Sequence, residues 1–332
     1  MISRFFLYIQ ILVASVLCVG FINSAQAQVA PSGAFQVTLT PPYPGPNQTV
    51  TAKLKAFTFN EDAADITWTV NGSVAASGKG KKDITLTTGG VGTKTTLNIT
   101  AKPLGSTERV QQTLTIYPAS IDILWHTNTY TPPGYRGKAL STQGAVVQFA
   151  ALPLLTADGV LLNKNNLTYE WYTNEKLFPQ ASGRGKHTFS FAFGGSPGVE
   201  TRIKVRVFDD TGSAAQERTI RIQNKNRLLY FYEVDPLRGP LYGNTTRNTL
   251  TVPSGKEIEI LAEPYYVTVP PQALSFAWRI GNIDLVSEKE RPNILTYRSD
   301  PGSKASQLVT LVVKNINSIF EHVQASFTIN VE

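Results

Sequence analysis

The chain has 332 residues, a net charge of +7, 42% hydrophobic residues and only 17% charged residues. The charged fraction is below the roughly 25% of an ordinary soluble protein, and together with 25 Gly and 20 Pro it excludes coiled coils and long solvent-exposed helices. One Cys and three His exclude a disulfide framework and a zinc finger. The hydrophobic content is sufficient to fill cores, which excludes extensive disorder.

Residues 1–27 have the organisation of a secretory signal. Arg4 precedes an apolar run over residues 5–22, and a small-x-small site follows at residues 25–27. This order predicts cleavage after Ala27. The alternative is an uncleaved membrane anchor, because the apolar run reaches the lower limit of a membrane span. Either form predicts an exported protein that is extracellular, periplasmic or on the cell surface, with membrane contact only through an uncleaved segment.

An internal repeat is the strongest pattern in the chain. The segment SGKGKKDITLTTGG beginning at Ser77 matches SGRGKHTFSFAFGG beginning at Ser182, and a third copy has SEKERPN in this place. Each copy has a tryptophan upstream of this point, at Trp68, Trp171 and Trp278. Self-similarity of this kind indicates tandem copies of one domain. The predicted domains are residues 28–118, 119–224 and 225–332.

Within each copy, apolar and polar residues alternate between turns rich in Gly, Pro and Asn. In chain order, the alternating segments include FQVTLT, TVTAKLKAF, VVQFAAL, TIRIQ, EIEILA and ASFTINV. This period of two predicts short strands, and their spacing favours an antiparallel β-sandwich in each copy. We expect Trp68, Trp171 and Trp278 to fill the core between the two sheets. The linkers at residues 118–119 and 224–226 are short, which predicts a semi-rigid rod.

The tryptophan step carries a resemblance to a known class of proteins. A hydrophobic-x-Trp-x-x-Asn-Gly step, a Gly-rich turn and two alternating strands resemble the tandem immunoglobulin-like and PKD-type repeats of secreted and cell-surface bacterial proteins. The chain has Asn71-Gly72 after Trp68 and Gly281-Asn282 after Trp278, where the PKD pattern has Gly-Asp-Gly. The resemblance implies three tandem all-β sandwiches with a spacer, adhesive or surface-layer role.

Loops that combine tyrosine with Gly and Pro occur early in each copy: TPPYPGPN, TYTPPGYRGK and DPLRGPLYGN. Since Gly and Pro disfavour central strands, we expect these tyrosines at an edge or end of each sandwich. Exposed tyrosines make good contacts with proteins or sugars. The alternative is a proline-stiffened segment whose tyrosine packs on its own sheet. The candidate partner-binding residues are Tyr43, Trp125, Tyr130, Tyr135, Arg136, Lys138 and Tyr242.

Signs of catalysis or cofactor binding are weak. His126, His187 and His322 lie in no nucleophile motif, so we expect no enzyme. The acidic pairs at residues 61–62 and 209–210 are typical of turns, with Ca²⁺ binding through their oxygens as the alternative. The Gly-rich turns lack the spacing and helix of a phosphate loop, so hairpin turns with positive φ are predicted.

The basic residues form no long stripe, so nucleic-acid binding is not expected. The predicted function is a structural or adhesive rod that presents aromatic loops to cell-envelope proteins or surface glycans. The alternative is a carbohydrate-binding module protein that stacks glycan rings on the loop tyrosines and tryptophan.

Overall fold

The computed structural model describes residues 33–211, 214–246, 248–318 and 320–332. The predicted signal sequence or anchor over residues 1–27 lies outside the described residues. No helix in the described part is long and apolar enough to cross a membrane. The described residues form strands and short 3₁₀ helices at Lys164–Asn166, Pro179–Ala181 and Pro271–Ala273. The prediction of an all-β fold is confirmed.

The chain divides into two compact units. Unit 1 contains the described part of Met1–Ser120 together with Leu154–Leu162 and Phe208–Gln216. Unit 2 contains Ile121–Pro153, Asn163–Val207 and Glu217–Glu332. Unit 1 therefore combines the first sequence repeat with two segments of the second. The domain boundaries derived from the repeat remain predictions.

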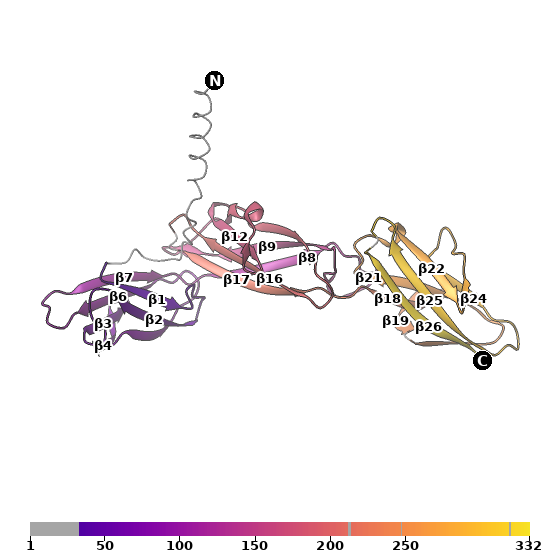
Figure 1. Cartoon of the computed structure of the whole chain (residues 1–332), viewed down its shortest axis with the longest axis horizontal. Helices are drawn as coiled ribbons and strands as arrows, with labels where there is room; N and C mark the ends of the chain where they lie inside the picture. Colours follow the sequence, from indigo (N-terminus) through magenta and orange to yellow (C-terminus); the bar gives the residue numbers. More distant parts are fainter. Residues whose placement is uncertain (1–32, 212–213, 247, 319) are drawn as a thin grey trace, which may run out of the picture. The chain divides into compact units, whose positions relative to one another are not determined.

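The first sandwich pairs a three-stranded sheet with a four-stranded sheet (Figure 1). The smaller sheet has the order β1-β2-β5, with bounds Phe35–Thr40, Thr49–Ala56 and Asp83–Thr87. The larger has the order β4-β3-β6-β7, with bounds Ser73–Lys79, Asp65–Val70, Thr95–Lys102 and Val110–Ile116. All strand pairings in both sheets are antiparallel. Inward side chains of both sheets, including Phe35, Leu54 and Trp68, form one buried cluster.

The second sandwich has the same plan. One sheet has the order β15-β9-β8, with bounds Thr188–Ala192, Val146–Leu154 and Ser120–Thr127. The other has the order β13-β12-β16-β17, with bounds Lys176–Leu177, Thr168–Thr173, Glu200–Phe208 and Ala215–Gln223. The short strand β14 (Gly183–Arg184) pairs with β12, and β10 (Thr156–Ala157) pairs with β11 (Val160–Leu161). Between the main sheets, the Trp171 ring lies 6.4 Å from Phe149 and 5.4 Å from Phe189.

The third sandwich contains two larger sheets. The first has the order β19-β18-β21-β24, with bounds Gly239–Thr246, Leu228–Asp235, Glu257–Tyr265 and Ile294–Arg298. The second has the order β20-β26-β25-β22-β23, with bounds Thr249–Val252, His322–Val331, Ala305–Asn315, Leu274–Ile280 and Ile283–Asp284. The sheets are antiparallel as predicted, except that β20 pairs with β26 in parallel. β20 follows β19 of the first sheet in the sequence but pairs in the second sheet, alongside β26.

The three tryptophans share one hydrogen-bonding arrangement. Their side chains are at most 2% exposed, and a buried indole N–H needs an acceptor. Trp68 Nε1 donates to the Lys81 carbonyl at 2.7 Å, and Trp171 Nε1 donates to the Lys186 carbonyl at 3.0 Å. Trp278 Nε1 donates to the Pro292 carbonyl at 3.0 Å. The Gly-rich turns of the first two copies thus supply the acceptor, and the third copy supplies it without such a turn.

Gly80 in the first of these turns is expected to be intolerant of a side chain. Its φ is +66°, and a Cβ there would lie 3.0 Å from the Asp62 carbonyl oxygen. We expect Gly80→Ala to lower the free energy of unfolding by about 1–2 kcal/mol, measured by urea titration. The control is Gly90→Ala, which has open space around its Cβ position and should change stability by less than about 0.5 kcal/mol. Equal losses in the two variants would contradict this account of the turn.

Candidate partner-binding surface

One outward face of the third sandwich is covered. Along β21, Ile260 and Ala262 belong to the core between the sheets. The residues that alternate with them point to the opposite face of the sheet. Leu261, Glu263 and Tyr265 are nevertheless all buried. Other side chains must therefore lie over this face.

The covering segment is the β8–β9 connection of the second sandwich, which belongs to the same unit. The Tyr130 N–H donates to the Val267 carbonyl at 2.7 Å, and the Tyr266 N–H donates to the Tyr130 carbonyl at 2.8 Å. Thr142 Oγ1 donates to the Tyr266 carbonyl at 2.9 Å. Tyr266 has a φ of +61°, which is exceptional for a bulky residue. Both of its backbone polar groups are thus bonded to the covering segment.

Tyrosine side chains interlock where this segment meets the sheet. The Tyr135 and Tyr266 hydroxyls share a hydrogen bond of 2.8 Å, and the Tyr135 ring packs edge-on against Tyr265 at 5.5 Å. The Tyr232 and Tyr265 hydroxyls share another of 2.8 Å, and Tyr232 packs against Tyr242 at 5.1 Å. Such edge-to-face pairs contribute about 0.5–1.5 kcal/mol each beyond burial. We call the following residues the tyrosine cluster: Tyr130, Tyr135, Tyr230, Tyr232, Tyr242, Glu263, Tyr265 and Tyr266.

Glu263 is the acidic member of the tyrosine cluster and is only 5% exposed. The Tyr242 hydroxyl donates to its Oε1 at 3.2 Å, and the Tyr130 hydroxyl donates to its Oε2 at 3.4 Å. Burial raises the pKa of Glu263, and the two tyrosine hydrogen bonds only partly oppose that effect. Burial, followed by the nearby Glu263 charge, raises the pKa of Tyr242 to about 12.

The raised pKa of Glu263 gives a prediction about stability and pH. A group whose pKa is higher in the folded state stabilises the fold below its unfolded pKa, and this stabilisation is lost as pH rises through the folded pKa. Glu263→Gln keeps an acceptor but removes the buried charge. We therefore expect it to raise the free energy of unfolding by about 1 kcal/mol near neutral pH and to flatten the profile between the ordinary glutamate pKa of 4.5 and neutral pH. Urea titrations across that range measure both effects, and an unchanged pH profile would contradict them.

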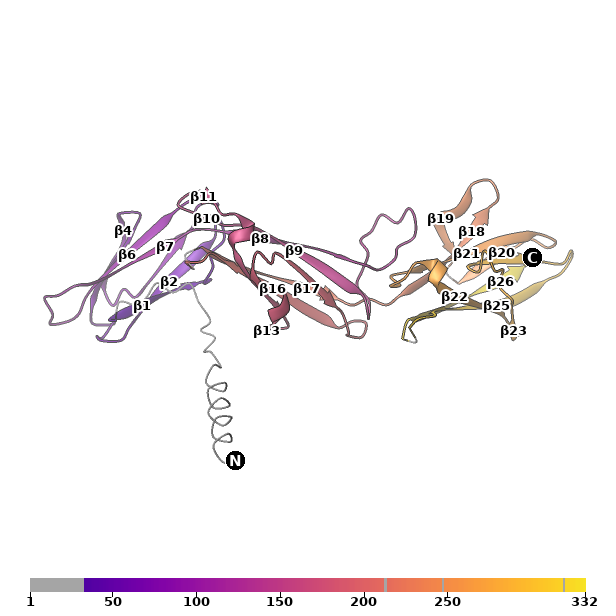
Figure 2. The ribbon, with the colours of Figure 1, turned by 90° about the horizontal axis from the view of Figure 1, so that it is seen from above.

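The structure brings three of the predicted site residues together. Tyr130, Tyr135 and Tyr242 all belong to the tyrosine cluster. Tyr135 is 38% exposed and Tyr242 is 40% exposed, so both lie at its rim. Tyr242 is on the β18–β19 hairpin, which Figure 2 shows extending beyond the other strands of the third sandwich. Arg136 follows Tyr135 in the covering segment and is exposed.

Trp125 and Lys138 form a separate pair. Trp125 lies half-buried on β8, and the Lys138 Nζ is 3.2 Å from the centre of its ring. This is a cation–π contact, and burial lowers the pKa of Lys138. One face of the Trp125 ring is thus occupied by the chain itself.

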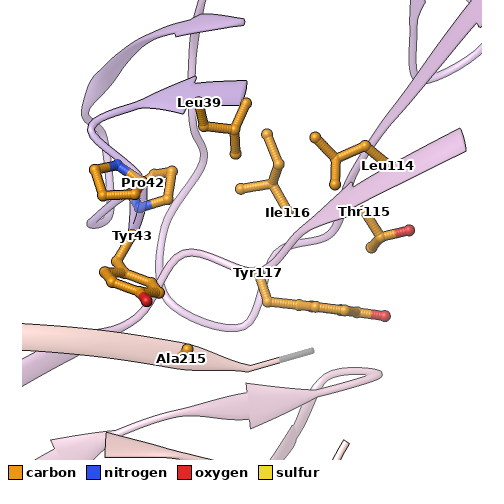
Figure 3. Close-up of a pocket in the computed structure, with 9 residues that line it drawn as sticks. Leu39, Pro42, Tyr43, Leu114, Thr115, Ile116, Tyr117 and Ala215 are labelled. Carbon is orange, nitrogen blue, oxygen red and sulfur yellow. The ribbon is translucent and has the colours of Figure 1, made fainter. Parts of the chain in front are cut away.

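Tyr43 lies in unit 1, at a small pocket. The pocket has a volume of about 50 Å³, and its lining includes Leu39, Pro42, Ile116, Tyr117 and Ala215 (Figure 3). Figure 3 shows the Tyr43 and Tyr117 rings on the side nearest Ala215. The Tyr117 hydroxyl donates to Asp158 Oδ1 at 2.7 Å. Small-molecule pockets usually have about 300–1,000 Å³, so this space is too small for a sugar ring.

Five members of the tyrosine cluster were not among the residues singled out from the sequence: Tyr230, Tyr232, Glu263, Tyr265 and Tyr266. The segment LLYFYEV over residues 228–234 carried a usable signal. Bulky residues occupy successive positions there, which is typical of a strand buried on both faces. That pattern indicates a covered face but does not say which segment covers it.

The groups weighed for metal or acid–base chemistry make local contacts. Asp209 Oδ1 accepts the Ala214 N–H at 3.1 Å, and Glu61 Oε2 accepts the Ala56 N–H at 2.6 Å. His187 Nδ1 lies 2.9 Å from the Gly185 carbonyl oxygen. In the described part of the chain, no three His, Cys, Asp or Glu side chains are grouped to hold a metal ion.

The paired sheets around buried tryptophans give the described residues a tandem β-sandwich fold, and the predicted resemblance to immunoglobulin-like repeats is confirmed at the level of the fold. No protein-family profile matches the chain, and no curated protein matches it.

Several solved structures resemble it at low similarity. The three N-terminal domains of the bacteriophage RB49 Highly Immunogenic Outer Capsid protein are 12% identical, with a TM-score of 0.27, over 90% of this chain and 99% of that one. The Clostridium thermocellum CbhA fibronectin(III)-like modules are 11% identical, with a TM-score of 0.27, over 57% and 94%. The Bacteroides ovatus SGBP-B, solved with a mixed-linkage heptasaccharide, is 10% identical, with a TM-score of 0.21, over 87% and 64%.

Proposed function

We propose that this chain is an exported, non-enzymatic protein that acts as a structural or adhesive component of the cell envelope. In this role it presents the rim of the tyrosine cluster to an envelope protein or a surface glycan. The observation that carries the proposal is that Tyr135 and Tyr242 are well exposed while their hydroxyls are held by Tyr266 and Glu263.

Fixed, exposed tyrosines suit an interaction surface for two reasons. Tyrosine supplies a large amphipathic contact area and is enriched at protein interfaces. A ring already held by hydrogen bonds loses little conformational entropy when a partner binds. Exposed Arg136 lies next to Tyr135 and adds a positive charge that can steer an acidic partner.

The contact between Lys138 and Trp125 favours this surface over glycan stacking on the loop aromatics. A sugar ring stacks on an open aromatic face, and Lys138 lies over one face of Trp125. The exposed rims of Tyr135 and Tyr242 do not require the chain to rearrange before they make a contact.

Co-sedimentation of the purified full chain with the envelope fraction of its source cells tests the proposal. We expect binding that Tyr242→Ser weakens about tenfold, as for an interface anchor. Tyr297→Ser is the matched control, since Tyr297 is a half-buried tyrosine on β24 of the same sheet. Treating the envelope with protease or with periodate distinguishes a protein partner from a glycan partner. No sedimentation, or equal weakening by both variants, would overturn the proposal.

The export step has its own test. The intact mass of the natively produced protein shows whether it begins at Gln28, as expected for a cleaved signal, or retains Met1 as an anchor. A protein recovered only from the cytoplasm would contradict export.

A further inference from the structure

The outward face of sheet β4-β3-β6-β7 in the first sandwich has an unusual composition. Trp68, Leu97, Ile99 and Leu114 point into the core, so the residues alternating with them point outward. Nine of these outward residues carry a hydroxyl or an amide and none of the nine is charged. We call them the neutral face: Thr67, Thr69, Ser77, Thr96, Asn98, Thr100, Gln111, Thr113 and Thr115.

The strand register arranges the neutral face in rows. The first row runs across the sheet through Ser77, Thr67, Thr100 and Gln111. The second runs from the exposed Val74 on β4 through Thr69, Asn98 and Thr113, and the third through Thr96 and Thr115. Charged residues begin beyond the first row, where Asp65 lies opposite Lys79 and Lys102.

Side chains of the neutral face are held in place. The Thr67 and Ser77 hydroxyls share a hydrogen bond of 2.8 Å, and Thr113 Oγ1 donates to Asn98 Oδ1 at 2.8 Å. Threonine is β-branched and has restricted χ1 freedom. The protein side chains on this face therefore lose little conformational entropy when a ligand binds.

The second sandwich shows that the fold does not require this composition. Its β12 carries Trp171 in the core as β3 carries Trp68, but the outward residues of the neighbouring β16 include three cations and the anion Glu200. Arg202, Lys204 and Arg206 occupy this strand, and Lys204 pairs with Glu175 at 2.7 Å. Solvent-facing surfaces ordinarily mix charges of both signs. The absence of charge from the neutral face is therefore a property of the first sandwich and not of the repeat.

We infer that the neutral face binds an uncharged polysaccharide chain. This inference rests on the proposed envelope role and names a glycan class and a surface for it. Each hydroxyl and amide both donates and accepts hydrogen bonds, as the hydroxyls of a neutral glycan do. Moving a charged group out of water is costly. Binding an uncharged polymer to this face avoids that cost, because neither partner brings a charge. The neutral face offers an anionic polymer no cation within its rows.

Affinity gel electrophoresis of the full chain in dextran, xylan or mannan tests the inference. We expect at least one of these polymers to retard the protein, with a dissociation constant on the order of millimolar for contacts without aromatic stacking. Thr100→Glu should abolish the retardation by placing a charge within the first row of the face. Thr113→Ala, which removes a hydroxyl without adding charge, should weaken binding at least about threefold.

The matched control is Thr85→Glu, an exposed threonine on β5 of the opposite sheet, which should leave the retardation unchanged. The inference is overturned if no uncharged polymer retards the wild type, or if Thr85→Glu and Thr100→Glu behave alike. It is also overturned if the wild type dimerises in solution and Thr100→Glu abolishes the dimer, because the occupant is then a second copy. A Thr100→Glu protein that the polymer retards like the wild type, and that still sediments with envelopes, overturns this inference alone. Loss of wild-type sedimentation overturns the proposed function.

Discussion

Replacing Trp278 by alanine is expected to lower the free energy of unfolding by about 3–5 kcal/mol. The indole lies in the core of the third sandwich, 2% exposed, with its ring 5.9 Å from Phe231. The substitution removes this packing and leaves the Pro292 carbonyl without the indole N–H that it accepts at 3.0 Å. Urea unfolding followed by far-UV circular dichroism measures the loss.

Trp125→Ala is the matched control. Trp125 is half-buried at the surface of β8, and its contact with Lys138 is a single cation–π pair. We expect this variant to lose about 1 kcal/mol or less, because the Trp125 side chain is only partly buried. Equal losses from Trp278→Ala and Trp125→Ala would contradict the placement of Trp278 between the sheets.

Glu321→Gln is expected to lower the free energy of unfolding by about 3 kcal/mol. The Glu321 side chain is 4% exposed and lies 3.4 Å from the Nε of Arg227, which is 12% exposed. Its carboxylate also accepts the Thr268 N–H at 2.5 Å and the Asn315 amide at 2.7 Å. The substitution leaves the Arg227 guanidinium buried without an anionic partner. An uncompensated buried charge is strongly destabilising.

The same carboxylate gives stability a pH dependence opposite to that of Glu263. Burial by itself would raise the pKa of Glu321, but hydrogen bonds from Asn315 and Thr268 and the Arg227 charge together lower it. A group with a lowered folded pKa stabilises the fold above its unfolded pKa, and this contribution is lost as pH falls through the folded pKa. Glu321→Gln should therefore remove part of the acid sensitivity of the wild type.

Asp62→Asn is the control for the Glu321 substitution. Asp62 pairs with Lys82 at 2.8 Å, and their side chains are 70% and 35% exposed; exposed pairs contribute little to stability. No measurable loss is expected in a urea titration. If Asp62→Asn lowered the free energy of unfolding as much as Glu321→Gln, burial of the ion pair would not explain the effect of the Glu321 substitution.

Local patterns in the sequence were sufficient to predict the β-sandwich fold. Strands follow from a period of two residues, and the Gly-rich turn lies close in sequence to the tryptophan that it serves, as in the bond from Trp68 to Lys81. The tyrosine cluster could not be predicted in this way. Tyr135 meets Tyr266 across 131 positions, and that meeting depends on how one loop docks on a distant sheet. The loop motif predicted Tyr130, Tyr135 and Tyr242 as a surface, but their buried neighbours required the fold.

The neutral face shows a different limit. Each strand segment, such as TTLNITAK at residues 95–102, reads only as an ordinary polar and apolar alternation. Threonine favours strands for intrinsic reasons, so its abundance alone carries no functional signal. The rows appear only when the register aligns Thr67 with Thr100 and Gln111. The neutral face could not be predicted because the register between strands cannot be read from the local pattern of each strand.

The last strand of the third sandwich has a mechanical consequence. β26 is bonded along both edges, through ten residue pairs with β25 and four with β20. Tension applied to the chain beyond Val331 acts along the strand, so the backbone hydrogen bonds of both ladders are loaded in shear and share the force. A hairpin pulled from its open end instead loses its bonds one after another. Because the height of the unfolding barrier governs forced unfolding, we expect this end of the molecule to withstand sustained pulling.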